Sequence, residues 1–325
     1  MTQPPVHPRT STKVGERVAG TVYTLPVVQP FRLDFTVSAL RRLPTNPIDV
    51  FTADCRYLHA VPGPRHPRIV QVRQVSDGEL EVTIDADAGD TSDHQELVAL
   101  VARTLGVSRD LSDFYRSSSD VPWLDPLARR LRGLKPPRYR SLWEAFVNAV
   151  VYQQVSLHAA SAVVQRIIRE FGTPLQSEGA ELYLFPAAAS VLAASDDILR
   201  GMGLSANKLA TLRRAAEAID SGRLGAATIE GLPSSEAAAL LRGIKGIGPW
   251  TATVILLRGF GRLDVFPMND SGVARNLSLA TGEPEANMGP VLEALGPHKG
   301  MLYFHLLLAR LEERGEVGLP SIPLR

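Results

Sequence analysis

Two features of the chain carry residue types that could bind a ligand, and they follow one another in sequence. Gly246-Ile247-Gly248 forms a glycine turn between two helical patterns, and the second helix begins at Pro249 or Trp250. Glycine suits a turn that needs positive φ and the close approach of a partner. Because the first amides of a helix have no internal acceptor, the turn and the helix N-terminus together predict a neutral cradle for one phosphate.

The second feature is a lone carboxylate. Asp270 follows about twenty residues after Trp250, directly before another helical pattern. An isolated aspartate in this place is typical of a helix N-cap. A helix N-terminus also favours the charged form of a carboxylate. Asp270 is therefore a candidate for a structural cap and for a catalytic anion, and the two roles are compatible.

The order of these parts resembles the helix-hairpin-helix (HhH-GPD) DNA glycosylases, and within them the 3-methyladenine DNA glycosylase II branch. The resemblance rests on four strings, which are Gly246-Ile247-Gly248-x-Trp250-Thr251-Ala252, Leu257-Arg258-Gly259, Asp264-Val265-Phe266 and Asp270. Segments 142–167 and 203–219 are similar to two further helices of the family. The likeness spans roughly the C-terminal two thirds of the chain.

The resemblance implies an N-glycosylase hydrolase of base excision repair that flips alkylated bases of the 3-methyladenine and 7-methylguanine type out of duplex DNA. Asp270 would stabilise the positive charge that develops on the deoxyribose and would orient the attacking water. Trp250 occupies the position where bifunctional relatives carry a Schiff-base lysine, and tryptophan cannot be that nucleophile. A monofunctional enzyme that leaves an abasic site without strand cleavage is expected.

The resemblance also implies roles for other residues. Gln154 would fill the gap left by the flipped base, with Gln153 as a neighbouring pocket or structural group. The expected base pocket contains Trp250, Tyr303 and Phe304. The expected phosphate contacts are Gly246, Gly248, Trp250, Lys245 and Arg258, with Arg242 as a further backbone contact. Val254, Ser271 and Leu307 stand where family members carry pocket aromatics, which leaves the lesion spectrum and the pocket breadth open.

Two other functions remain open at this point. One is an oxidised-guanine glycosylase on the same scaffold, and the other is a non-catalytic DNA-lesion-binding protein. The absent lysine argues against the usual bifunctional form of the first, and Asp270 argues against the second. No cofactor is expected beyond a monovalent cation on the hairpin carbonyls, and no side-chain metal cluster is visible. The expected partner is damaged double-stranded DNA, bound by a monomer.

Composition fits this reading. The chain has 325 residues, of which 45% are hydrophobic and 21% charged, as in a folded protein, and its formal net charge is +1. The segment 242–275 contains five basic and two acidic residues. This local surplus of positive charge suits a modest DNA footprint. The single cysteine excludes an internal disulfide and a four-cysteine cluster. Without an apolar leader or a membrane-length apolar run, a cytoplasmic protein is expected.

The elements that must position these residues predict an α+β fold. A flexible arm is expected over 1–29, an antiparallel sheet domain over 30–91 and an all-helical glycosylase domain over 92–325, with the active-site cleft between two helical subdomains. Alternating apolar residues predict strands at 31–37, 70–75 and 80–84, the last two joined by a turn at 76–79. Helices are expected at 95–105, 122–131, 142–150, 158–171, 187–192, 206–219, 235–244, 250–258, 271–280 and 301–314.

Overall fold

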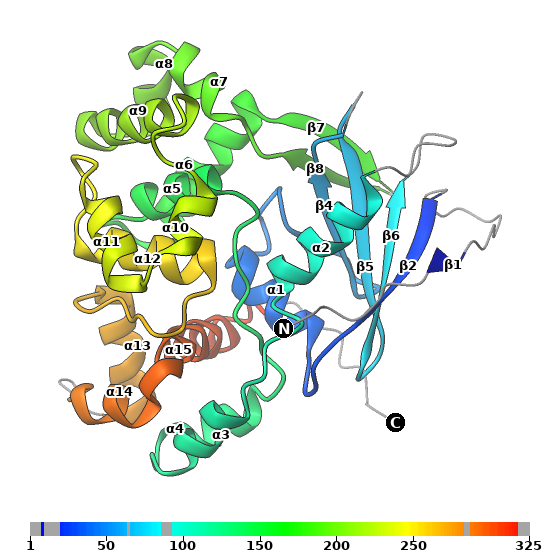
Figure 1. The fold of residues 1–325 in the computed structure, drawn as a ribbon, viewed down its shortest axis with the longest axis vertical. Coiled ribbons are helices and arrows are strands. Elements are labelled where there is room, and N and C mark those ends of the chain that lie inside the picture. The colour runs from blue at the N-terminus through cyan, green and yellow to red at the C-terminus, as the bar shows by residue number, and fades with distance from the viewer. Residues whose placement is uncertain are drawn as a thin grey trace.

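An antiparallel sheet stands beside a larger body of helices (Figure 1). The computed structural model describes residues 8–9, 20–63, 66–85, 93–177, 179–282 and 287–317. The six strands of the sheet lie in the order β1-β2-β6-β5-β4-β3, and every neighbouring pair is antiparallel. Their bounds are β1 Pro8–Arg9, β2 Gly20–Pro26, β3 Val50–Phe51, β4 Arg56–Val61, β5 Arg68–Ser76 and β6 Glu79–Asp85.

The predicted hairpin of the sheet is confirmed, and one predicted boundary is wrong. Strands β5 and β6 are joined by a turn at residues 77–78, as the alternating pattern indicated. Strand β2 pairs with β6 along its whole length, although its residues fall in the range expected to be a flexible arm. Residues 1–7 and 10–19 of that arm lie outside the described residues.

The strand predicted over residues 31–37 is wrong, because this segment enters helix α1 (Leu33–Arg41). Eight of the helix's nine residues are buried, including Thr36 and Ser38. A helix buried on almost every side has no polar stripe, and its alternating side chains then imitate the period of a strand. The burial of this segment in the tertiary structure, which its local sequence pattern does not show, therefore accounts for the wrong prediction.

The remaining chain is mainly helical, and each of the ten predicted helices is found with its ends shifted by at most two residues. The helices after α1 are α2 His94–Leu105, α3 Ser112–Ser119, α4 Leu124–Arg130, α5 Leu142–Val151, α6 Leu157–Phe171, α7 Ala188–Ala193, α8 Asp196–Gly201, α9 Ala206–Asp220, α10 Ala226–Gly231, α11 Ser234–Arg242, α12 Pro249–Phe260, α13 Ser271–Thr281, α14 Gly289–Leu295 and α15 Gly300–Glu313, with a 3-10 turn at Gly296–His298.

The region expected to be all-helical also contains a two-stranded hairpin. Strands β7 (Thr173–Ser177) and β8 (Ala180–Leu184) follow α6, and β8 packs against β4. Leu182 joins Leu58, Ala60 and Ile69 in a small apolar cluster. The hairpin thus covers the outer face of strand β4 and ties the helical body to the sheet.

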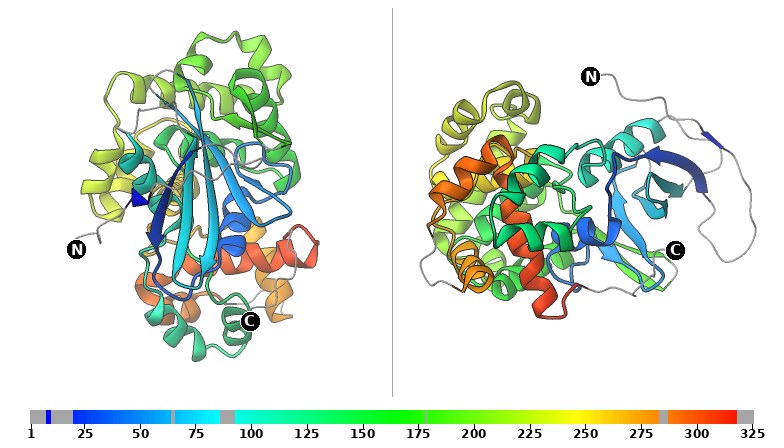
Figure 2. Two further views of the ribbon diagram at one scale, coloured as in Figure 1. Left: turned by 90° about the vertical axis from the view of Figure 1, so that its right-hand side faces the viewer. Right: turned by 90° about the horizontal axis from the view of Figure 1, so that it is seen from below.

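Two apolar cores hold the elements that carry the predicted site. One core runs from the sheet through α2, α5, α9 and α12, and the other joins α1, α3 and α4 to α13 and α15. In Figure 2 the sheet covers one side of the molecule and the helices lie behind it. Helix α12 contacts α5 and α11, and α13 contacts α15. The hairpin, Asp270 and the α5–α6 turn are therefore fixed by packed helices.

Candidate active site and nucleic-acid interface

The glycine hairpin joins α11 to α12, as the sequence predicts. Gly248 is the N-cap of α12 and Pro249 takes the first helical position, where its missing N–H costs nothing. No side chain caps this helix. The first amides of α12 are consequently left for an external acceptor, and a phosphate is the group that such an N-terminus binds best.

The two glycines of the hairpin are needed for different reasons. Gly246 has φ +104, and a Cβ there would lie 1.9 Å from the hydroxyl of Thr211 on α9. This glycine is required by the fold itself. A Cβ on Gly248 would meet nothing within 4 Å, so no internal contact requires a glycine at this N-cap. Gly248 therefore leaves open space beside the uncapped first amides of α12.

Asp270 is the N-cap of α13, and both of its oxygens accept hydrogen bonds. Oδ1 accepts from the amides of Gly272 at 2.8 Å and Val273 at 3.0 Å. Oδ2 accepts from the indole Nε1 of Trp250 at 2.8 Å. Asn269, with φ +60, turns the chain immediately before it. The carboxylate is half-buried, held in one orientation by three N–H donors, and lies at the positive end of a helix.

Trp250 brings the hairpin and the carboxylate together. It lies in the first turn of α12, its half-buried ring packs against the larger core, and its indole N–H reaches Asp270. The predicted phosphate cradle and the candidate catalytic anion are thus joined by a single side chain. The sequence places these residues twenty positions apart and gives no sign of this hydrogen bond.

The two predicted glutamines occupy different environments. The Nε2 of Gln153 donates to the Thr251 hydroxyl at 2.7 Å and to the Gly246 carbonyl at 3.2 Å, which ties the α5–α6 turn to the hairpin. Gln154 is exposed and has φ +54, and Val155 beside it is 44% exposed. Gln154 therefore stands at the tip of a turn that its neighbour anchors, which suits a residue that enters DNA.

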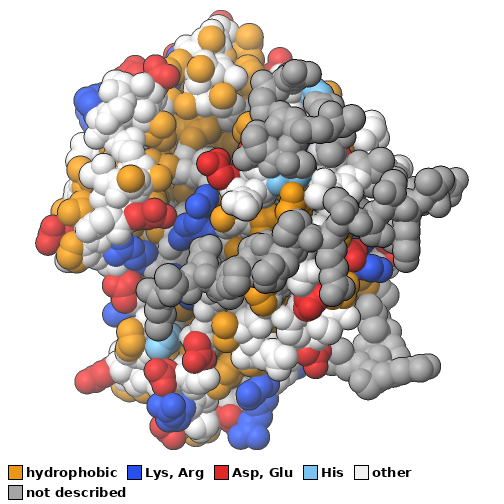
Figure 3. All heavy atoms as spheres, turned by 45° about the vertical axis from the view of Figure 1, so that its right-hand side comes forward, with side chains coloured by type: hydrophobic (Ala, Val, Ile, Leu, Met, Phe, Trp, Pro, Cys, Tyr) orange, Lys and Arg blue, Asp and Glu red, His pale blue; other side chains and the backbone are white. Residues whose placement is uncertain are grey.

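Basic side chains near the hairpin fall into exposed and structural groups. Arg242, Lys245 and Arg275 are exposed. Arg262 instead donates to the carbonyls of Ile229, Glu230 and Leu232, and so holds α10 in place. On the face drawn in Figure 3, acidic and basic side chains are interspersed. The positive charge available to DNA is local, as the net charge of +1 implies.

Arg258, predicted to contact phosphate, is instead part of the core. Its side chain is fully buried, and Nη2 donates to the carbonyls of Ala39 and Leu40 at 2.9 Å each. Nε donates to the Tyr139 hydroxyl at 3.1 Å. The last carbonyls of a helix lack internal donors and attract cations, so Arg258 closes the C-terminus of α1. The phosphate prediction for Arg258 is wrong for this structure.

The two predicted pocket aromatics on α15 lie in different environments. Phe304 is fully buried in the second core and meets the ring of Tyr303 edge-on, so its placement in the base pocket is wrong for this structure. Tyr303 is 8% exposed, and its hydroxyl accepts from Nη2 of Arg42 at 3.4 Å. Of the positions without the family's aromatics, Val254 is buried, Leu307 half-buried and Ser271 exposed.

Two carbonyls at the hairpin already accept side-chain hydrogen bonds. Arg214 donates to the Lys245 carbonyl at 3.3 Å, and Gln153 occupies that of Gly246. Within the described ranges, no group of three His, Cys, Asp or Glu side chains is placed to hold a metal ion. No helix in the described part of the chain is long and apolar enough to cross a membrane.

The chain is similar in sequence to several known proteins. Residues 147–288 match the family model described as HhH-GPD superfamily base excision DNA repair protein. A DNA-3-methyladenine glycosylase of Bacillus subtilis is 24% identical over 213 residues, 65% of this chain and 70% of that protein. A probable bifunctional transcriptional activator/DNA repair enzyme of Mycobacterium tuberculosis is 30% identical over 57% of this chain, but only 36% of its own length is matched.

Solved structures share the fold across both the sheet and the helices. A 3-methyladenine DNA glycosylase from Archaeoglobus fulgidus has a TM-score of 0.73 at 23% identity, over 88% of this chain and 97% of its own. An 8-oxoguanine glycosylase/lyase of Clostridium acetobutylicum, in complex with DNA, has a TM-score of 0.71 at 15% identity, over 97% of this chain and 100% of its own. At these identities the likeness concerns the fold alone. The family match spans α6 to α13, and so includes the hairpin and Asp270, and over these elements the chain is similar to the HhH-GPD superfamily of base excision DNA repair proteins.

Proposed function

We propose that this protein is a monofunctional DNA glycosylase that flips alkylated purines of the 3-methyladenine and 7-methylguanine type out of duplex DNA and hydrolyses their N-glycosidic bond. The observation that carries the proposal is the hydrogen bond between the Trp250 indole and the Asp270 carboxylate, at the first turn of the helix that follows the hairpin. The curated relatives named DNA-3-methyladenine glycosylase support the choice of base.

Asp270 is the proposed catalytic residue. Breaking the glycosidic bond moves an electron pair to the base and leaves positive charge on the deoxyribose. A carboxylate held by three N–H donors cannot turn away from that charge, and a preorganised anion stabilises the transition state without the cost of reorientation. The same oxygens can accept a proton from the water that adds to the sugar.

The hairpin is the proposed anchor for the DNA backbone. The amides of Gly248 and Trp250 at the uncapped N-terminus of α12 would bind one phosphate, with Lys245 and Arg242 adding charge nearby. From that anchor, Gln154 at the exposed tip of the α5–α6 turn would enter the duplex and replace the flipped base. A monovalent cation on hairpin carbonyls is part of this proposal, since backbone carbonyls are ligands that such ions accept.

The monofunctional reaction follows from Trp250. Its indole has no nucleophilic amine, so no Schiff base with the sugar can form at this position. The half-buried ring is the proposed wall of the base pocket, where a flat indole would stack on an electron-poor alkylated purine. We further propose that the protein acts as a monomer inside the cell.

Single-turnover base release tests the proposal. Duplexes carrying 3-methyladenine, 7-methylguanine, ethenoadenine or 8-oxoguanine are incubated with an excess of wild-type protein or Asp270→Asn. We expect the wild-type protein to release methylated bases and to leave the strands intact until alkali treatment. In Asp270→Asn the rate constant for base release should fall by at least about 10²-fold. Replacing K⁺ by a bulky organic cation in the same assay tests the hairpin ion, whose loss should weaken DNA binding.

The other outcomes are equally definite. Release of 8-oxoguanine alone would identify an oxidised-guanine glycosylase. Strand scission without alkali would contradict the monofunctional mechanism. Tight binding to damaged duplexes without release of any base would leave Asp270 as a helix cap in a lesion-binding protein.

A further inference from the structure

Met268, in the loop that leads to Asp270, is the most exposed large apolar side chain of the described residues. It is 53% exposed, whereas Leu263 and Phe266 in the same loop are each 7% exposed and Pro267 is buried. Single exposed apolar residues are common on proteins, so exposure alone decides nothing. What distinguishes Met268 is its place, two residues before the proposed catalytic carboxylate.

The backbone around Met268 is fixed. Its amide donates to the Phe266 carbonyl at 2.9 Å and closes a three-residue turn at Pro267, whose ring restricts φ. Directly after Met268, Asn269 has φ +60 and Asp270 caps α13. The side chain is therefore exposed by a defined turn and not by a frayed loop.

The start of the loop is held by α15. The amide of Gly300, the first residue of that helix, donates to the Leu263 carbonyl at 2.7 Å. A Cβ on Gly300 would lie 2.9 Å from the Leu263 Cα and 3.0 Å from the Val265 carbonyl oxygen, so helix and loop are in direct backbone contact. Burying Met268 by a shift of the loop would require α15 to move as well.

The first turn of α12 links this loop to the α5–α6 turn. Trp250 donates to Asp270 at 2.8 Å, and the next residue, Thr251, accepts from Gln153 at 2.7 Å. The catalytic loop, the first turn of α12 and the α5–α6 turn are therefore one connected surface. DNA that brings a sugar to Asp270 also meets Met268.

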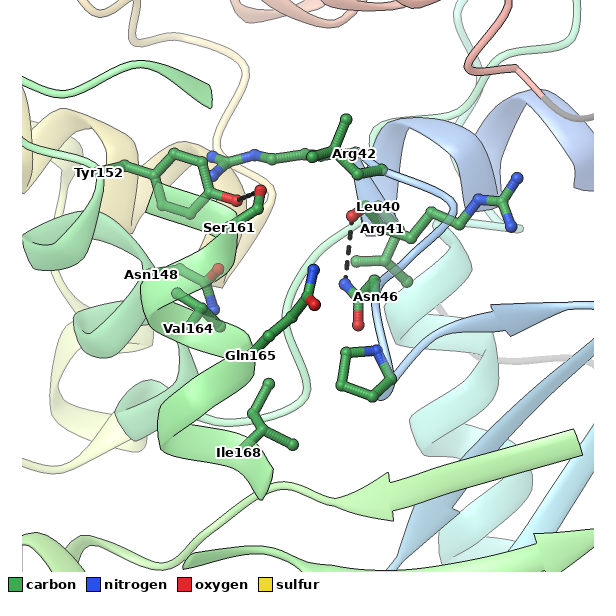
Figure 4. A pocket seen from close by; sticks show the side chains of 12 residues that line it. Leu40, Arg41, Arg42, Asn46, Asn148, Tyr152, Ser161, Val164, Gln165 and Ile168 are labelled. Atoms are coloured by element: carbon green, nitrogen blue, oxygen red, sulfur yellow. Dashed lines mark hydrogen bonds between the residues drawn. The ribbon is translucent and has the colours of Figure 1, made fainter. Parts of the chain in front are cut away.

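The α5–α6 turn at the other end of this surface is closed as well. The hydroxyls of Tyr152 and Ser161 are hydrogen-bonded across it at 2.7 Å, as Figure 4 shows at the edge of the pocket between α1 and α6. Gln154 is exposed between them. The connected surface thus presents two side chains from fixed turns, the polar Gln154 at one end and the apolar Met268 at the other.

The reach of Met268 follows from its distance to Asp270. Two residues span at most about 7 Å, and successive nucleotides of one strand rise by about 3.4 Å. When Asp270 lies at C1′ of a flipped nucleotide, the adjacent nucleotide of that strand is therefore within reach of Met268. A thioether offers neither charge for a phosphate nor a donor for a base edge. Its unbranched apolar chain is suited to the carbon face of a deoxyribose.

We propose that Met268 is a DNA-binding residue that packs on the deoxyribose of the nucleotide next to the lesion and holds it while its neighbour is flipped. This inference rests on the proposed function. Because the contact is apolar, its contribution to affinity is independent of salt, unlike that of Lys245 at the hairpin. A 2′-hydroxyl at the contacted sugar would lose its water without gaining a partner, so Met268 also selects deoxyribose over ribose there.

Fluorescence anisotropy with a duplex that carries a tetrahydrofuran abasic site measures the contact. In Met268→Gln we expect Kd to rise about fivefold at every salt concentration, because burial of the exposed half of the side chain is lost. Met268→Leu stays apolar and should change Kd by less than about twofold. In Lys245→Gln, by contrast, the slope of log Kd against log salt should become smaller by about 1.

The matched control is Leu279→Gln. Leu279 is 51% exposed, close to the value for Met268, but lies near the C-terminal end of α13, away from the residue that caps it. The same polar substitution should leave Kd and base release unchanged there. Thermal unfolding should be as in the wild type for all of these variants, because each replaced side chain is exposed.

Single ribonucleotides placed on either side of 7-methylguanine test the choice of sugar. At one of the two positions the ribonucleotide should slow single-turnover base release by the wild-type protein about fivefold or more. In Met268→Gln, whose amide can bond to the hydroxyl, the same ribonucleotide should slow release by less than about twofold.

Three results would overturn the proposal and leave the proposed function intact. They are wild-type Kd in Met268→Gln, a loss in Met268→Leu as large as that in Met268→Gln, and a ribonucleotide effect that is the same with and without the methionine. Release of no base by the wild type would instead be a failure of the proposed function, and the Kd comparison would still decide whether Met268 contacts DNA.

Discussion

At the scale of single residues, Asp270 performs two tasks with two different oxygens. Oδ1 caps α13, and Oδ2 receives the indole N–H of Trp250. The cap needs only an acceptor, whereas stabilisation of a sugar cation needs a negative charge. Substitutions that separate acceptor from charge therefore separate stability from catalysis.

The first prediction uses Asp270→Asn and Asp270→Ala. Asparagine caps helices about as well as aspartate, whereas alanine loses the cap at a cost of about 1 kcal/mol. We expect the free energy of unfolding to fall by about 1 kcal/mol in the first variant, because its Nδ2 cannot accept from the Trp250 indole, and by about 2 kcal/mol in the second, which loses that bond and the cap. Both should lose base release. Urea unfolding beside single-turnover release measures this, and near-wild-type release by Asp270→Asn would contradict the role of the charge.

The hairpin glycines give the second prediction. In Gly246→Ala the new methyl would lie 1.9 Å from the Thr211 hydroxyl at φ +104, so a loss of at least about 2 kcal/mol in unfolding free energy is expected. In Gly248→Ala the methyl meets nothing within 4 Å, and stability should be unchanged. Its affinity for duplex DNA, measured by fluorescence anisotropy, should nevertheless fall, because the methyl occupies the approach to the helix amides. Wild-type affinity in Gly248→Ala would refute the cradle.

At the scale of elements, local patterns predict what is held locally. The hairpin, α12 and the cap of α13 follow from glycines, a proline and an aspartate within forty residues. Helix α1 was not predictable in this way, because its burial depends on α15 and on distant loops. The same holds for Arg258, which looks like a phosphate ligand in sequence but finds its carbonyl acceptors more than two hundred positions away.

The α5–α6 turn supplies the third prediction, from two adjacent glutamines. Gln153→Ala removes two hydrogen bonds to the hairpin region, so the free energy of unfolding should fall by about 1–2 kcal/mol. Gln154→Ala alters an exposed tip and should leave stability unchanged, while base release slows because the flipped state loses its plug.

Thermal unfolding and single-turnover release on the same preparations distinguish the two glutamines. An abasic-site duplex, from which the damaged base is already absent, serves as the binding control for both variants. Full activity in Gln154→Ala would exclude this residue as the plug and direct attention to its exposed neighbour Val155.

At the scale of the whole molecule, a buried ionic network joins the sheet to the helices. Arg140 donates to Asp49 at 2.5 Å and to Glu144 at 2.6 Å, and the Tyr57 hydroxyl of β4 donates to Asp49 at 2.6 Å. Burial opposes the ionisation of Asp49, but the Arg140 guanidinium outweighs it and lowers the pKa of Asp49. Burial raises the pKa of Glu144. The network fixes α5, and with it the α5–α6 turn, relative to the sheet.

Two buried histidines, His59 in the sheet and His305 in α15, make stability depend on pH. Burial lowers the pKa of His59 in the sheet to about 3 and that of His305 in α15 to about 4. Neither ring nitrogen of His59 has a hydrogen-bond partner among the described residues, and Nε2 of His305 has none there either. Both rings therefore stay neutral in the folded protein while the unfolded chain takes up protons below about pH 6.5.

The sign of the effect follows from proton binding. Below about pH 6.5 the unfolded state binds more protons at these two sites, so the free energy of unfolding falls on acidification by about 1.4 kcal/mol per pH unit for each histidine. We expect His59→Phe and His305→Phe each to reduce the slope between pH 6.5 and 5 by about that amount, and the double variant by twice as much. The measurement is the slope of the free energy of unfolding against pH, obtained by urea unfolding and compared between variant and wild type. Carboxylate titrations cancel in this comparison, and the pH-independent effect of each substitution does not enter it. A slope unchanged by either substitution would mean that these rings take up protons in the folded state, and that water reaches them.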